Sequence, residues 1–414
     1  MPAFLTHWRV LIETARHSED VGNELGSLII DAAALRRRAQ GWPVPPQTTP
    51  GGAVWDTGPL PEIDFRFPGS DISAMAYVGA LAPDIPYFQK GKLRAKISDD
   101  RLSRGTHPPL SANSDVAWAD LLHTNRSGDV LLAFLEHIAD IPSPALRSQA
   151  LAFAMGYLSH IGADIALNPC INALAGAYQH RDIPGVFATL GRHFYIELCL
   201  DAYIASTYFN RSLYSWTKQP WVQYIEPAAR SLVAPTTLST QVLDLLTLAA
   251  EVTYGFSEEQ SKAFRQDYLA GLRGLRRYLA GRGIFRLLTL STLLRNRKDQ
   301  QITATIAEIH REPGTITFEE AIAYAVRLSQ HLCRRGISYY AALRNTNASA
   351  SERRQKRAAL CDDLRNWNLE TGYALDVTFD GVVTLHFLHN WAHFARLWDS
   401  EAGNMIQAHQ SLIN

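Results

Sequence analysis

Apolar residues recur at three- and four-residue spacings along most of the chain, which is the pattern of amphipathic helices. Polar residues that stand close to a proline, at Ser143-Pro144 and at Asp182-Ile183-Pro184, indicate two of the helix starts. We therefore predict a mainly α fold, a multi-helix bundle, whose clearest helical segments are 4–17, 20–40, 71–81, 129–140, 144–167, 183–209 and 239–253.

Other parts of the chain lack the helical pattern. Residues 374–387 alternate apolar and polar positions around Asp380-Gly381, which predicts one small β-hairpin. Residues 41–70 are rich in proline and glycine, which disfavours regular structure. Residues 89–117 are rich in lysine and arginine, and two interpretations stay open for them: a solvated surface loop, or a basic flap near a phosphate.

The character of the chain changes after about residue 257. A basic amphipathic pattern covers 266–288, another helix is predicted over 318–343, and a polar linker that runs into a helix covers 348–367. We predict a first domain over 1–257. The remainder, 258–414, is predicted to be a helical extension packed on the first domain.

Composition narrows the classes of function. The chain has 414 residues, of which 47% are hydrophobic, so it can bury a large core. Its 40 lysines and arginines balance its 40 aspartates and glutamates. A zero net charge gives no overall basic field, and no clear nucleic-acid patch stands out, so phosphate binding must come from a local site.

The four cysteines are far apart and form no CxxC pair, which argues against a disulfide framework and a thiolate zinc knuckle. Polar residues come too early in the N-terminal stretch for a secretory signal, and no apolar run reaches the roughly 18 residues of a membrane span. We expect a cytoplasmic protein, or one exported by a route independent of a signal peptide.

Two pairs of side chains carry candidate chemistry. His160 and Asp164 are four residues apart on an apolar helical segment, and so are His193 and Glu197. Residues at this spacing share a helix face, so each pair offers an imidazole and a carboxylate to one point. Zinc accepts both ligands. The alternative is that each pair stabilises its helix or satisfies a core histidine.

Five short motifs occur in the order seen in zinc-dependent phospholipases C: THW near the start, GALAPDIPYF at 79–88, LLHTNRSGD at 121–129, GYLSHIGADI at 156–165 and HFYIELCLD at 193–201. Over roughly residues 1–205 the chain thus resembles this family. Zinc-dependent single-strand nucleases and the N-terminal part of glycosylphosphatidylinositol-specific phospholipase D are related to it. The resemblance implies an all-helical fold, as the periodicity does.

The resemblance also implies a zinc site. Asp84 would be a ligand or the base that handles the attacking water, and Asp164 could bridge two metals. Family members usually place a histidine four or six residues after that aspartate, where this chain has Asn168 and Cys170. These two residues are possible ligands: either Cys170 supplies a thiolate in place of the imidazole, or the zinc at His193 and Glu197 is weak or absent. We therefore expect two or three Zn²⁺ per chain. The implied ligands are His7, Asp84, His123, His160, Asp164, His193 and Glu197.

The function implied is that of a phospholipase C, which cleaves a glycerophospholipid into diacylglycerol and a phosphorylated head group by metal-activated water. The substrate would be met at a membrane surface, and Trp216 and Trp221 are candidates for that interface, with a place in the core as the alternative. Two other functions stay open: a related nuclease or phosphodiesterase, and a catalytically impaired binding protein on the same scaffold.

Overall fold

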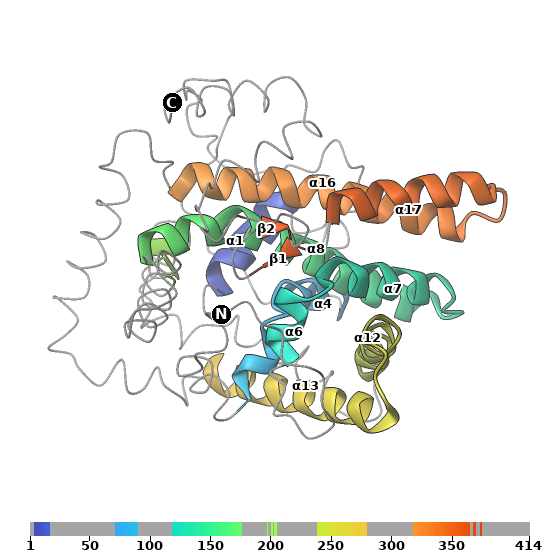
Figure 1. Ribbon diagram of the computed structural model, residues 1–414, viewed down its shortest axis with the longest axis horizontal. Helices are drawn as coiled ribbons and strands as arrows, with labels where there is room; N and C mark the ends of the chain where they lie inside the picture. The colour runs from blue at the N-terminus through green and yellow to red at the C-terminus, as the bar shows by residue number, and fades with distance from the viewer. Residues whose placement is uncertain are drawn as a thin grey trace, which may run out of the picture.

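The structure is a computed structural model that describes residues 4–16, 71–89, 118–175, 238–279, 318–364, 367–369 and 373–374, together with 197, 200, 201, 203 and 204. This part of the chain is mainly helical, as predicted (Figure 1). Its elements, labelled as in Figure 1, are α1 (Phe4–Arg16), α4 (Asp71–Gly79), the 3-10 helix η2 (Ile85–Phe88), α6 (Trp118–Thr124), α7 (Ser127–Ala139), α8 (Pro144–Ala175), α12 (Leu238–Tyr254), α13 (Glu258–Leu279), α16 (Phe318–Arg344), α17 (Ala350–Leu364), β1 (Trp367–Asn368) and β2 (Tyr373–Ala374).

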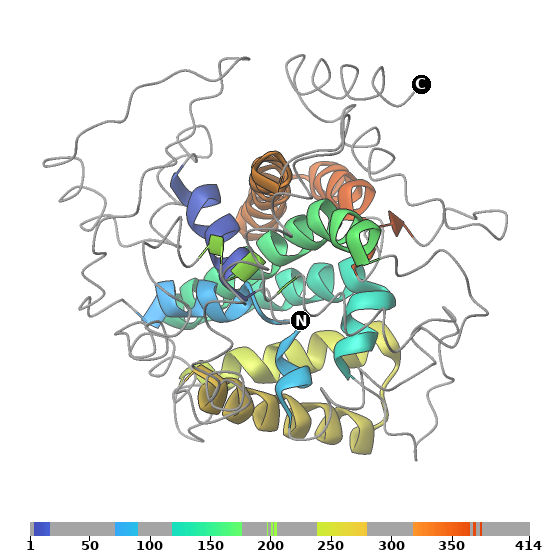
Figure 2. The ribbon, with the colours of Figure 1, turned by 90° about the vertical axis from the view of Figure 1, so that its left-hand side faces the viewer.

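Helix α8 is the central element of the bundle. It packs against α1, α4, α7, α12 and α16, so both the N-terminal helix and helices from the far end of the chain lie on it (Figures 1 and 2). Ser143 and Pro144 begin α8 as predicted, with the amide of Leu146 donating to the Ser143 hydroxyl. Because partners surround it beyond its first turns, α8 is mainly apolar and shows no separate solvent-facing polar face.

The stretch Pro144–Asn168 of α8 would be long and apolar enough to cross a membrane, but its most apolar window lies wholly inside the protein. Length and composition alone therefore do not make it a membrane span, since the core helix of a bundle has the same properties.

The core is continuous from α1 to β1. Trp8, Phe134, Tyr157, Phe264 and Trp367 are all buried within one apolar cluster. The helices after residue 257 thus share a core with those before it: α13 packs on η2, and α16 packs on α8 and α1. The proposed domain boundary near residue 257 stays a prediction.

Six of the predicted helices are present, as α1, α4, α7, α8, α12 and α16, and the expected helix after the polar linker is α17. Helix α6 was not predicted because seven residues are too few to show a helical period. The predicted hairpin at 374–387 lies almost wholly outside the described residues. Strands β1 and β2 instead pair antiparallel through Trp367 with Ala374 and Asn368 with Tyr373. The predicted segments 20–40 and most of 183–209 also lie outside them.

Helices α4 and α8 approach each other so closely that one position requires glycine. A Cβ atom at Gly156 would overlap the carbonyl oxygen of Ala76 and lie 2.6 Å from the amide nitrogen of Ala80. Both are backbone atoms, which cannot move aside without shifting α4. The contact between α4 and α8 also affects the site, because α4 ends at Gly79 and the turn that follows it carries Asp84.

We expect Gly156→Ala to lower the free energy of unfolding by about 1–3 kcal/mol, although alanine favours a helix, because the added methyl group overpacks α4 against α8. Chemical denaturation measures the change. Gly336→Ala on α16 is the matched control, since its methyl group would meet the flexible end of Leu158. Equal or higher stability of the Gly156 variant would contradict this account of the packing.

Candidate metal centre

Five of the side chains predicted as zinc ligands meet in the interior of the bundle. Each is buried, with at most 6% of the residue exposed. They come from four separate parts of the fold: the first turns of α1, the turn between α4 and η2, helix α6, and two adjacent turns of α8. In that order they are His7, Asp84, His123, His160 and Asp164.

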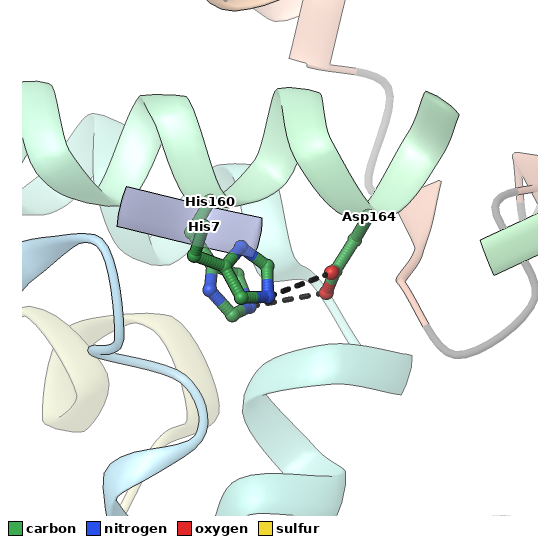
Figure 3. A group of neighbouring side chains, drawn as sticks. All are labelled: His7, His160 and Asp164. Atoms are coloured by element: carbon green, nitrogen blue, oxygen red, sulfur yellow. Dashed lines mark ion pairs between the residues drawn. The ribbon is translucent and has the colours of Figure 1, made fainter. Parts of the chain in front are cut away.

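The atoms that could bind a metal lie at ligand spacing. His160 Nε2 is 3.0 Å from Asp164 Oδ2, and His7 Nε2 is 3.4 Å from Asp164 Oδ1 (Figure 3). His123 Nε2 lies 3.3 Å from Asp84 Oδ1 and 3.4 Å from His160 Nε2. Ligands bound tetrahedrally to zinc at about 2.0–2.1 Å stand about 3.3 Å from one another. The observed separations are therefore close to the edges of a zinc tetrahedron.

Backbone carbonyl groups fix the orientation of two of the imidazole rings. His123 Nδ1 lies 2.7 Å from the carbonyl oxygen of Ala119, and His160 Nδ1 lies 2.9 Å from that of Ala80. A neutral ring that donates its Nδ1–H to a carbonyl group presents a lone pair at Nε2, which is how metal-binding histidines are commonly held. Two Nε2 lone pairs that face each other repel unless a cation or a proton lies between them. The donor set thus fits zinc.

The third ring is held differently. His7 stacks on His160 with ring centroids 4.1 Å apart and an interplanar angle of 11°. Its Nδ1 is buried and has no hydrogen-bond partner among the described residues. Burial, reinforced by the positive charge of His160, lowers the pKa of His7 to about 4. His7 is therefore neutral at physiological pH and can present a lone pair to a metal.

The charges of the cluster depend on one another. Burial by itself would lower the pKa of His160, but the charge and hydrogen bond of Asp164, together with the charge of Asp84 and the carbonyl oxygen of Ala80, raise it. In the same way, burial would raise the pKa of Asp164, but the charge and hydrogen bond of His160 lower it. Without a metal, the proton on His160 is the cation that Asp164 attracts.

Asp164 faces two sets of rings at once. Its Oδ1 atom points to His7, while its Oδ2 atom is near His160 and lies 3.7 Å from His123. The described ligands accordingly form two overlapping groups that share His160. One contains His7 and Asp164, and the other contains Asp84 and His123. A carboxylate with one oxygen toward each group has the geometry needed to bridge two cations.

The remaining predicted ligands lie elsewhere or outside the described residues. Glu197 is buried but belongs to neither group. The side-chain nitrogen Nδ2 of Asn168 donates to the carbonyl oxygen of Leu369, which ties α8 to the end of β1. His193, Trp216, Trp221 and the side chain of Cys170 lie outside the described residues.

The structure also reveals a buried residue that was not predicted. Oδ1 of Asp201 accepts hydrogen bonds from the amide and the hydroxyl of Thr6, both at 3.1 Å, and so holds the first turn of α1 beside His7. Burial raises the pKa of Asp201 well above its usual value. The sequence carries a signal for this residue: Asp201 stands four positions after Glu197, which continues the one-face spacing of His193 and Glu197.

Comparison with known families bears on the same residues. Residues 60–234 match a family described as zinc dependent phospholipase C. Searches of curated proteins and of solved structures found no match. Four of the five clustered residues lie inside the matched range, and His7 precedes it. Over residues 60–234, the chain is therefore similar to zinc-dependent phospholipases C.

Proposed function

We propose that the protein is a zinc-dependent phosphodiester hydrolase that acts as a phospholipase C. The observation that carries the proposal is the meeting of three imidazoles and two carboxylates at ligand spacing in a buried site. Isolated buried charges are costly, so a cluster of this kind is usually paired with a cation. The match to the family supports the same conclusion.

Zinc held by these residues would supply Lewis acidity, which lowers the pKa of water and stabilises negative charge on phosphoryl oxygens. The residues of the chain set where that chemistry takes place. His123 and His160 are oriented by the carbonyl groups of Ala119 and Ala80, so their Nε2 atoms are fixed before a substrate arrives. Such preorganisation saves the cost of arranging the ligands during the reaction.

Asp84 has two proposed roles, as a ligand and as the group that takes a proton from the attacking water. Burial would raise its pKa, but the hydrogen bond with His123 and the charge of His160 help to lower it well below its usual value. A carboxylate that is ionised across the physiological range is a good ligand and a weak base. We therefore put the role of ligand first and that of proton acceptor second.

The proposed substrate is a glycerophospholipid met at a membrane surface, with diacylglycerol and a phosphorylated head group as products. The family match supports this choice. The balanced charge of the chain gives no support to a nucleic-acid substrate. Release of phosphorylated head group compared with release of nucleotides distinguishes the two substrates directly.

We expect His160→Ala and Asp164→Asn each to lower head-group release by about 100-fold or more, because either change removes a donor near the centre of the cluster. The measurement is head-group release from phospholipid vesicles, paired with metal analysis of dialysed protein. His137→Ala on α7 is the control, since this histidine lies outside the cluster. Undiminished turnover in both cluster variants would remove them from the reaction.

Zinc should also stabilise the fold. A ligand that binds only the native state raises the free energy of unfolding by about 4 kcal/mol when present at a thousand times its dissociation constant. Adding Zn²⁺ to metal-free protein should therefore raise the unfolding temperature of the wild type. The gain should be much smaller in His160→Ala. An equal rise in both proteins would show that zinc binds elsewhere.

Zinc affinity should fall as the pH is lowered, because Zn²⁺ must displace the proton from His160. The pKa of His160 is raised above 6.5, so this competition begins above the pH at which an ordinary histidine titrates. Below the raised pKa, affinity should fall about tenfold per pH unit for each proton displaced. His7 adds nothing until about pH 4. Chelator competition across this range measures the slope, and a flat profile would contradict the assignment.

A further inference from the structure

The hairpin formed by α12 and α13 begins after the last residue of the family match, yet it packs against segments that carry two of the proposed ligands. In Figure 1 α13 lies below α6 and α12 lies to its right, and α13 packs on η2. Asp84 directly precedes η2, and His123 is near the end of α6. These two ligands come from segments far apart in the chain, so their separation of 3.3 Å depends on whatever holds η2 and α6 together.

One carboxylate on α13 joins the two segments. Asp267 Oδ1 accepts a hydrogen bond of 2.7 Å from the side-chain nitrogen Nε2 of Gln89, which follows Asp84 by five residues. Asp267 Oδ2 accepts a bond of 2.9 Å from the indole nitrogen of Trp118, which precedes His123 by five residues. Each oxygen thus binds one of the two ligand-bearing segments.

The backbone of α13 is also unusually close to the η2 segment. A Cβ atom at Gly271 or at Gly274 would overlap the carbonyl oxygen of Ile85 or of Phe88, respectively. One turn before Gly271, the buried hydroxyl of Tyr268 donates to the carbonyl oxygen of Ala82 at 3.1 Å. The chain on both sides of Asp84 is therefore fixed to α13.

Helix α12 holds the other segment. The hydroxyl of Tyr254 donates to the carbonyl oxygen of Asn125 at 2.7 Å, just past the end of α6. Arg126 adopts a left-handed backbone conformation with φ of 52° and donates to the carbonyl oxygen of Thr253. The ring of Trp118 packs edge-on against Phe256 and Phe264. Both ends of α6 are thus fixed to the hairpin.

We infer that Asp267 is a positioning residue for the metal centre, and that by binding Gln89 and Trp118 together it sets the distance between Asp84 and His123. The inference rests on the proposed metal centre. It gives part of the chain beyond the family match a role at that centre: the α12–α13 hairpin acts as a clamp that holds two ligands from separate segments at zinc spacing.

Asp267 can be tested apart from general stability because it is only half buried and is not a ligand. In Asp267→Asn one carboxylate oxygen becomes an NH₂ group, which faces a donor and cannot accept its hydrogen bond. Changes to groups that orient metal ligands typically cost 10- to 100-fold in metal affinity. We expect the Zn²⁺ affinity of Asp267→Asn to fall by about tenfold or more, while the unfolding temperature of the metal-free protein changes little.

The matched control is Asp244→Asn. Asp244 lies on α12 of the same hairpin and accepts a hydrogen bond of 2.6 Å from Arg265, but it is exposed and faces neither ligand segment. Its zinc affinity should equal that of the wild type. Trp118→Phe is a second test variant: it keeps an aromatic ring, removes the donor to Asp267 along with part of the buried indole, and should weaken zinc binding in the same direction.

Titration with Zn²⁺ measures affinity, and the visible absorption of the Co²⁺-loaded proteins reports ligand geometry. A weakened affinity and an altered Co²⁺ spectrum in Asp267→Asn and Trp118→Phe, with Asp244→Asn unchanged, support the inference. Zinc affinity and spectra equal to those of the wild type in both test variants overturn it and leave the proposed function intact. Failure of the wild type to bind Zn²⁺ overturns the proposed function as well.

Discussion

Two carboxylates and three imidazoles are buried together in this protein, where α1, α6, α8 and the turn between α4 and η2 meet. Taking a carboxylate out of water costs several kcal/mol unless an opposite charge or hydrogen bonds replace the lost hydration. The raised pKa of His160 shows Asp164 drawing a proton to the place where a divalent cation would sit.

Helix packing determines whether the lost hydration can be replaced. The carbonyl oxygen of Ala80 orients His160 only because α4 and α8 touch at Gly156, where there is no room for a side chain. The ring of His7 is placed by α1, whose first turn is held by Asp201. A displacement of either contact by a fraction of an ångström would alter the spacing of the ligands. The tight packing of the core thus sets the spacing of the side chains that could bind a metal.

The family match ends at residue 234, but residues after that point also hold the proposed ligands in place. Asp267 and Tyr268 on α13 bind the segment that carries Asp84. Near the other end of the chain, the amide of Leu369 donates to the carbonyl oxygen of His123 at 2.7 Å, and its carbonyl oxygen accepts from Asn168. Asn168, at a position where family members commonly have a ligand, here forms a structural link. The later helices therefore complete the scaffold around the ligands.

Hydrophobic periodicity was enough to predict the helical class and the places of α1, α7, α8 and α12, because a helix buries one face at a fixed spacing. The pairing of His160 with Asp164 followed from the same geometry, since residues four apart share a helix face. Motif order added His7, Asp84 and His123 through the resemblance to a family. Short elements such as α6 were not predicted because seven residues are too few to show a helical repeat of apolar positions.

Only the tertiary structure decided which of these side chains meet and what holds them. No local pattern relates Asp267 to Gln89 and Trp118, or Asp201 to Thr6, since each contact joins residues more than a hundred positions apart. The structural contact of Asn168 is likewise visible only in the tertiary structure, where its side-chain Nδ2 donates to the carbonyl oxygen of Leu369. Local propensity fixes which residues share a helix face. Long-range packing fixes which faces converge, because the free energy that selects it is spread over the whole core.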